Sequence, residues 1–223
     1  MERNSKGNLQ NIISRLQVSW LDLLNSSLAE TKLEAGIFTF LIDSYTDCRR
    51  SYHNLNHVDD ILNSIGRVEN FAENVDVLKF SAWFHDCIYD PQSSDNEVDS
   101  AVAAVKALEQ LKIDRQTIKK VEQIILSTKY HQPLIASIDN LLFLDLDLAI
   151  LGSDRDRYRQ YARAIRQEYS YISDRDYQIG RKKVLTQFLN RERIYYTEYF
   201  YRLLETIART NLQQEINHLD RLH

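Results

Sequence analysis

Apolar residues recur every three or four positions along almost the whole chain, which is the spacing of a helix with one buried face. Leu16, Trp20 and Leu23, for example, fall on one stripe. The 223 residues include only five glycines and two prolines, whereas sheet proteins of this size need many more turn residues. The pattern therefore predicts an all-α fold of nine or ten helices with short connections.

Start and stop signals set the boundaries of these helices. Ser94 and Glu97 have the spacing of a capping box, Asp139 is a candidate N-cap, and Gly152 is expected to end the helix that follows it. The segment around 75–89 is apolar on most sides and belongs in the interior. The expected helices cover about residues 8–26, 31–46, 52–66, 75–89, 95–111, 114–129, 140–151, 154–171, 174–189 and 197–220.

Composition narrows the class of protein. The net charge is -4 with basic and acidic residues interspersed, unlike the basic surface of a nucleic-acid binder, so no nucleic-acid polymer is expected. There is no apolar run long enough for a membrane span, and the first ten residues lack a signal-peptide core. The two cysteines, Cys48 and Cys87, fit a reducing compartment. We expect a cytoplasmic protein.

Ionisable residues stand in unusually apolar surroundings in three separate segments. His53 and His57 are four residues apart, which on a helix places both rings on one face. His85 and Asp86 lie in the most apolar segment, and two aspartates alternate with leucines over 144–148. Burying such groups is costly unless a partner satisfies them, and a divalent cation suits both imidazole and carboxylate. The three segments together predict a metal site.

At these residues the chain resembles the HD superfamily of metal-dependent phosphohydrolases. The signature of that family is a histidine, a His-Asp doublet and a distant aspartate, matched here by 52–57, 82–86 and 146–148. A bacterial group of predicted HD phosphohydrolases shares longer motifs, matched by 50–57, 83–90, 96–101 and 144–152. The resemblance implies one HD-like helical bundle over 1–223, with additional N- and C-terminal helices. Its motif core covers about 45–155, and a C-terminal helical extension covers about 156–223.

The resemblance also implies roles for individual residues. His53 is the candidate general acid, and Asp86 both binds the metal and orients the attacking water. The first element is similar to that of cyclic-nucleotide phosphodiesterases, but their later histidine and nucleotide-selecting glutamine pocket are lacking, so their specificity does not transfer. The implied metal ligands are His57, His85, Asp86 and Asp147.

Other assignments remain open at the level of sequence. Asp145 and Asp147 point to opposite sides of a helix, so only one can be the ligand, and the motif favours Asp147. Arg50 could contact the substrate. His131 could contact the substrate or bind a second metal, or it could instead be a loop residue at a helix end. Glu97 could contact substrate or serve only its capping box. Four arginines at 155, 159, 163 and 166 could guide an anionic substrate or form a solvated face paired with acids.

The sequence predicts an enzyme that hydrolyses phosphate esters, with a nucleotide or another small phosphorylated metabolite as substrate. One divalent ion is expected as cofactor, drawn from manganese, iron, cobalt, nickel, zinc or magnesium. No membrane partner is expected, and homo-oligomerisation is left open. The main alternative is a catalytically silent metal- or nucleotide-binding regulatory module on the same fold. A metal-free helical protein is the third hypothesis.

Overall fold

The computed structural model describes residues 2–221 and confirms the all-α prediction. Within those residues there is no strand, and no helix combines the length and apolar character needed to cross a bilayer. Three short 3-10 helices, η1 to η3, cover Thr31–Leu33, Glu69–Phe71 and Leu148–Gly152. The α-helices are α1 (Glu2–Ser26), α2 (Glu34–Tyr45), α3 (Leu55–Ile65), α4 (Val75–Phe84), α5 (Asn96–Gln110), α6 (Arg115–Thr128), α7 (Ile138–Asp147), α8 (Arg155–Glu168), α9 (Asp174–Leu189) and α10 (Glu198–Leu219).

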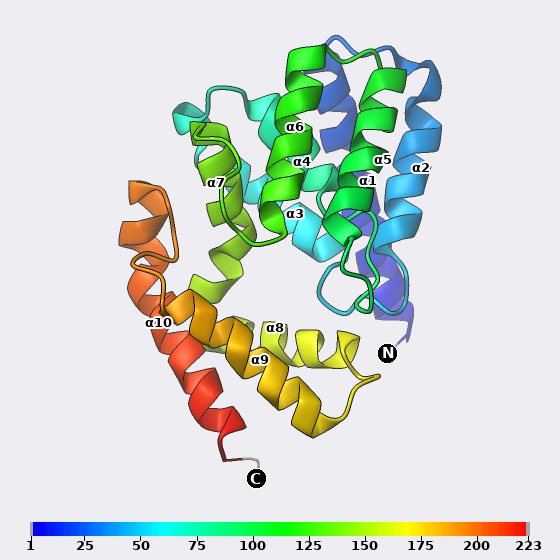
Figure 1. Ribbon diagram of the computed structural model, residues 1–223. Helices are drawn as coiled ribbons and strands as arrows, with labels where there is room; N and C mark the ends of the chain where they lie inside the picture. The colour runs from blue at the N-terminus through cyan, green and yellow to red at the C-terminus, as the bar shows by residue number, and fades with distance from the viewer. Residues whose placement is uncertain (1, 222–223) are drawn as a thin grey trace. The chain divides into compact units, whose positions relative to one another are not determined.

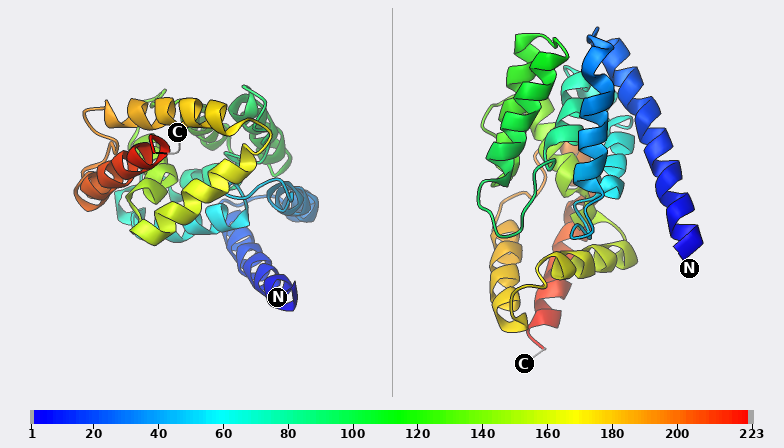
Figure 2. Two further views of the ribbon diagram at one scale, coloured as in Figure 1. Left: turned by 90° about the horizontal axis from the view of Figure 1, so that it is seen from below. Right: turned by 90° about the vertical axis from the view of Figure 1, so that its right-hand side faces the viewer.

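The chain forms two compact units, Met1–Phe143 and Leu144–His223, and α7 carries the chain from the first to the second. In the first unit α4 is the interior helix. The α5–α6 pair packs along it on one side, and α3 and α1 pack on the other (Figures 1 and 2). This arrangement explains why α4 is apolar all round, as its sequence predicted.

An aromatic cluster forms the centre of the first unit. The Trp20 ring packs edge-on against Trp83, with ring centroids 5.4 Å apart, and also contacts Phe80 and Phe84. All four side chains are fully buried. Three of them come from α4, so this cluster fixes how that helix is seated and therefore where the residues after it lie.

Asp139 does not cap its own helix, contrary to the sequence prediction. α7 begins at Ile138, and the Ser137 hydroxyl accepts from the backbone N–H of Asn140 instead. The buried Asp139 carboxylate accepts from the backbone N–H groups of Glu73 and Asn74, immediately before α4. A carboxylate that would be costly to bury alone is thus used to fix the start of α4.

Three further boundaries correct the sequence predictions. α3 begins at Leu55, so His53 precedes the helix that carries His57 and the shared helical face does not exist. α4 ends at Phe84, which leaves His85 as its C-cap. The capping box predicted for Ser94 is also absent, because α5 starts at Asn96 and its N-cap is Asp95. The Asn96 side chain accepts from the backbone N–H of Asp90 and donates to the Asp90 carbonyl.

In the second unit, α9 and α10 run antiparallel side by side, and η3 packs against α10 (Figure 1). A buried ion pair joins the two long helices: Arg181 donates to both carboxylate oxygens of Glu215, at 2.8 and 3.2 Å. The Tyr158 hydroxyl on α8 donates to the same carboxylate. Glu215 therefore ties three helices of this unit together.

Candidate metal centre

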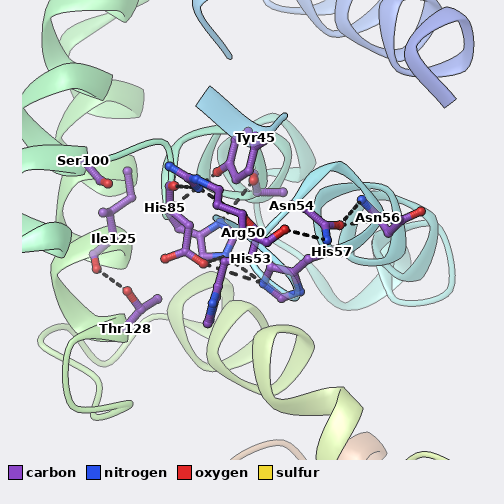
Figure 3. A network of polar contacts seen from close by, with 12 residues as sticks. Tyr45, Arg50, His53, Asn54, Asn56, His57, His85, Ser100, Ile125 and Thr128 are labelled. Carbon is purple, nitrogen blue, oxygen red and sulfur yellow. Dashed lines mark hydrogen bonds and ion pairs between the residues drawn. The ribbon is translucent and has the colours of Figure 1, made fainter. Parts of the chain in front are cut away.

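His57 is placed by the first turn of α3. Asn54 is the N-cap, and its side-chain oxygen accepts from the Asn56 amide, which fixes the start of the helix two residues before His57. His57 is 4 % exposed. Its ring faces the interior of the first unit, toward the end of α4 (Figure 3).

His85 is the residue at which α4 ends, and its ring is oriented by the helix itself. The ring Nδ1 lies 3.1 Å from the Ala82 carbonyl oxygen. A carbonyl oxygen can only accept, so Nδ1 carries the proton and Nε2 of the neutral ring carries the lone pair. Backbone anchoring of this kind fixes the tautomer of metal-binding histidines.

Three lone-pair donors converge where these segments meet. Nε2 of His85 lies 3.1 Å from Nε2 of His57 and 3.1 Å from Oδ2 of Asp86, and the remaining separation, His57 to Asp86, is 3.9 Å. A second proton on His85, at Nε2, would turn only one of its two close contacts into a hydrogen bond. One divalent cation could bind the lone pairs of all three atoms. Ligands about 2.1 Å from a common ion lie roughly 3.0 to 3.4 Å apart. The two contacts of His85 fall in this range and the separation of His57 from Asp86 exceeds it, so the group is a His/Asp site that could hold a metal after a small adjustment.

The electrostatics of Asp86 agree with a cationic environment. Burial raises the pKa of a carboxyl group, but in the metal-free site a protonated His85 acts against this by charge and hydrogen bonding, and the charges of protonated His53 and His57 add to its effect. Together the three histidines hold the pKa of Asp86 well below its usual range. The carboxylate is therefore ionised and able to act as a ligand at neutral pH.

Arg50 fixes the turn that carries Asp86. Its guanidinium donates to the backbone carbonyls of Asp86 at 2.6 Å and Cys87 at 3.1 Å. It also donates to the backbone carbonyl of His53 at 3.2 Å (Figure 3). It lies over the rings of Tyr45 and Tyr89 and is only 9 % exposed. These contacts give Arg50 a structural role beside the candidate metal ligands His57, His85 and Asp86. The predicted phosphate contact stays a prediction.

Two hydroxyl groups, from Tyr45 and Ser100, complete the support of this turn, and the sequence analysis identified neither. The Tyr45 hydroxyl donates to the Trp83 carbonyl and accepts from the Asp86 amide. Ser100 on α5 pairs with both backbone groups of Ile88. Ser100 stands within one of the recurring motifs, 96–101, so its motif position was the available signal. Tyr45 gave no signal, because its partners lie 38 and 41 residues away along the chain.

His53 lies next to the cluster although it is outside α3. Its ring centroid is 6.0 Å from that of His57 and 4.5 Å from that of Tyr89, and the residue is half-buried. The ring thus lies next to the candidate ligand atoms without joining them, and part of its surface is open to solvent. A general acid for a substrate bound at the cluster needs a position of this kind.

The structure gives Asp145 a role that is not metal binding. Its carboxylate accepts from the backbone N–H groups of Tyr196 and Thr197, both at 2.7 Å, and from the Thr197 hydroxyl at 2.6 Å. These donors lie just before α10, within the second unit. Burial raises the pKa of Asp145 to about 6, and the hydrogen bonds from Thr197 and Tyr196 oppose that rise.

The remaining candidates occupy separate elements. His131 is half-buried in the turn after α6, with a left-handed backbone (φ 45°). Glu97 is half-buried in the first turn of α5. Asp147 is the last residue of α7 and is half-buried. Their predicted roles in substrate or metal binding stay predictions.

Comparison with known proteins adds no assignment: no family model, no curated protein and no solved structure matches this chain. The functional conclusion therefore rests on the sequence motifs and on the geometry of the cluster.

Proposed function

We propose that the chain is a metal-dependent phosphohydrolase of the HD type. The observation that carries the proposal is the convergence of Nε2 of His57, Nε2 of His85 and Oδ2 of Asp86 within 3.1 to 3.9 Å, with the His85 tautomer fixed by Ala82. Such a donor set is suited to a divalent ion and is expensive to bury without one.

Asp147 is the proposed fourth ligand. α7 is continuous from Phe143 to Asp147, and the Phe143 ring packs edge-on against His85, with centroids 5.5 Å apart. In the sequence, 146–148 matches the third element of the family signature, and this match assigns the distant aspartate to Asp147. His57, His85 and Asp147 are residues of the types that could hold a metal ion. Asp145 is excluded from this role by its bonds to Thr197 and Tyr196.

The chemistry follows from the residues around the cluster. A bound divalent ion supplies a Lewis-acid centre that polarises a phosphoryl oxygen and makes a water molecule more acidic. Asp86 is the proposed residue that orients that water, and the approach of its Oδ2 to both histidines supports this role. His53, with its partly exposed ring, donates a proton to the leaving oxygen near neutral pH. Arg50 and Tyr45 hold the turn so that these groups keep their spacing.

The proposal is tested by measuring metal and turnover on the same preparations. Protein purified without a histidine tag and without chelator is analysed for metal content. It is then assayed against phosphomonoesters, phosphodiesters and nucleotides with each of the six candidate metals. Asp86→Asn, which keeps the shape of the side chain, is expected to lose most of the bound metal and at least about 100-fold of the turnover, since ligand loss removes Lewis-acid activation. His85→Ala should behave in the same way.

Asp99→Asn is the matched control, because Asp99 is an exposed carboxylate on α5 outside the cluster. It should retain both metal and activity, and circular dichroism checks that all variants fold. Turnover unchanged in Asp86→Asn would contradict the proposal. Metal bound by the wild type, with no turnover of any substrate in the panel, would instead favour the silent regulatory module.

A further inference from the structure

An arginine-lined cavity lies entirely within the second unit, among α8, α9 and α10. Its volume is about 960 Å³, at the upper end of the range of small-molecule sites. One wall is the stripe of four arginines on α8 that the sequence analysis left open between substrate guidance and a solvated face. Arg221, just after α10, also lines the cavity.

The positive charge of this cavity is only partly neutralised. Arg166 pairs with Asp174 at 2.6 Å, and Arg159 has only a 4.0 Å contact with Asp156. Arg155 and Arg163 have no hydrogen-bond or ion-pair partner anywhere in the described part of the chain. Two exposed guanidinium groups on one helix face, two turns apart, thus face a cavity without a counterion.

The acidic residues that line the cavity do not cancel this charge. Asp174 is already engaged by Arg166. Glu215 receives two hydrogen bonds from the buried Arg181 and one from the Tyr158 hydroxyl, so its charge is balanced within the wall. The cavity keeps a net positive lining, which attracts anions.

A polar side chain in the cavity wall adds hydrogen-bonding groups to the arginines. Gln178 on α9 lines the cavity and is 9 % exposed. Its side-chain amide has no hydrogen-bond partner among residues 2–221. Its amide atoms are open to the cavity and are therefore available to a molecule bound there.

We infer that this cavity binds a small molecule carrying a polyphosphate group. Guanidinium groups bind phosphate oxygens through paired, charge-assisted hydrogen bonds, and several arginines along one wall suit several linked phosphates. The volume exceeds what inorganic phosphate needs, and Gln178 offers both a donor and an acceptor to the rest of the ligand. This site differs from the candidate metal site, where His57, His85 and Asp86 contact one another. Those three residues belong to the first unit.

The test measures binding of ATP, inorganic triphosphate and adenosine to the full chain by isothermal titration calorimetry. Excess EDTA and about 0.15 M salt suppress metal-dependent binding and weak surface attraction. ATP and triphosphate are expected to bind with a stoichiometry of one, and adenosine is expected to bind far more weakly. The same titrations on Asp86→Asn should give unchanged affinity, so a failure of the phosphohydrolase proposal would leave this result intact.

Two variants locate the site. Arg155→Gln with Arg163→Gln should weaken triphosphate binding at least about tenfold, because each charge-assisted hydrogen bond lost costs roughly that factor or more. Gln178→Leu keeps the side-chain volume and should weaken ATP binding several-fold. The matched control, Arg175→Gln with Lys183→Gln, removes the same charge from exposed positions of α9 that do not line the cavity.

Three outcomes would overturn the inference. The first is no binding of ATP or triphosphate at millimolar concentration. The second is equal weakening by the cavity pair and the control pair, which would show attraction to net charge alone. The third is an RNA oligonucleotide that binds while ATP does not, which would assign the arginines to a macromolecular surface. Tight binding lost in both cavity variants and kept in the control pair would establish the site.

Discussion

At the scale of single residues, two aspartates only two positions apart have opposite fates. Asp145 and Asp147 lie on one helix, and the geometry of a helix allows only one of them to face a given neighbour. Asp145 turns toward the segment before α10 and satisfies three donors there. Asp145 therefore serves the packing of the second unit, and the proposed metal-binding role of Asp147 is separate from it.

This division predicts different consequences for two similar substitutions. Asp145→Asn should keep bound metal but lower the free energy of unfolding by about 1 to 3 kcal/mol, because an amide nitrogen cannot accept the hydrogen bonds now made to one of its oxygens. Asp147→Asn should lose metal affinity with little loss of intrinsic stability once metal is removed. Urea unfolding in EDTA, combined with metal analysis, separates the two. Metal loss in Asp145→Asn alone would reverse the assignment.

The candidate metal site of His57, His85 and Asp86 depends on residues that are not candidate ligands. His85 is useful because the Ala82 carbonyl holds its Nδ1–H, and Asp86 is useful because Arg50 and Tyr45 hold the turn around it. Motif reading identified the ligand types. The partners that orient them became visible only through contacts in space.

At the scale of elements, short connections place the groups that matter. η3 brings the chain from α7 to α8 and packs closely on α10. The sequence predicted that Gly152 ends a helix, and it does close η3. Gly152 also allows η3 and α10 to approach each other closely. A Cβ added at Gly152 would lie 2.5 Å from Cβ of Leu204. Since that atom adjoins the backbone, η3 and α10 would have to separate.

Gly152→Ala is therefore expected to destabilise the protein by about 1 to 3 kcal/mol, the usual cost of overpacking a tight contact. Gly180→Ala is the control. Gly180 lies within α9, and a methyl group added there would meet no neighbouring atom within 4 Å, so alanine should leave stability unchanged or raise it by up to about 1 kcal/mol. Thermal unfolding of both variants measures the contrast. Equal effects would contradict the close approach.

At the scale of the whole molecule, the proposed ion joins distant parts of the sequence. His57 and His85 are 28 residues apart, and neither α3 nor the end of α4 holds the two rings together without the surrounding fold. A ligand that binds only the folded state stabilises it in proportion to the logarithm of its concentration relative to its dissociation constant. The proposed metal site therefore predicts that metal binding and folding are coupled in this chain.

Chelator should lower the melting temperature of the metal-loaded protein. If the concentration of free metal is about 100-fold above its dissociation constant, chelation lowers the free energy of unfolding by about 2.7 kcal/mol. For a chain of this size, that change lowers the melting temperature by several degrees. Re-addition of the metal should restore the original value. Asp86→Asn serves as the internal control, because it should melt at the same temperature with and without EDTA. An identical melting temperature for the wild type in both conditions would indicate that no structural metal is bound.

The sequence alone determined the helical class and most helix positions. Periodicity and the scarcity of glycine and proline are local properties that survive without knowledge of the tertiary fold. It also singled out His57, His85 and Asp86, because ionisable groups in apolar surroundings need a partner wherever they are placed.

Only the tertiary structure decided how those residues are used. It placed His53 before α3, gave Asp139 to the start of α4 and Asp145 to the segment before α10, and showed that two arginines of the α8 stripe face a cavity without acidic partners. Each of these outcomes depends on groups far apart in the chain. A local pattern shows that a polar group needs a partner, and only the packing of distant segments determines which partner it finds.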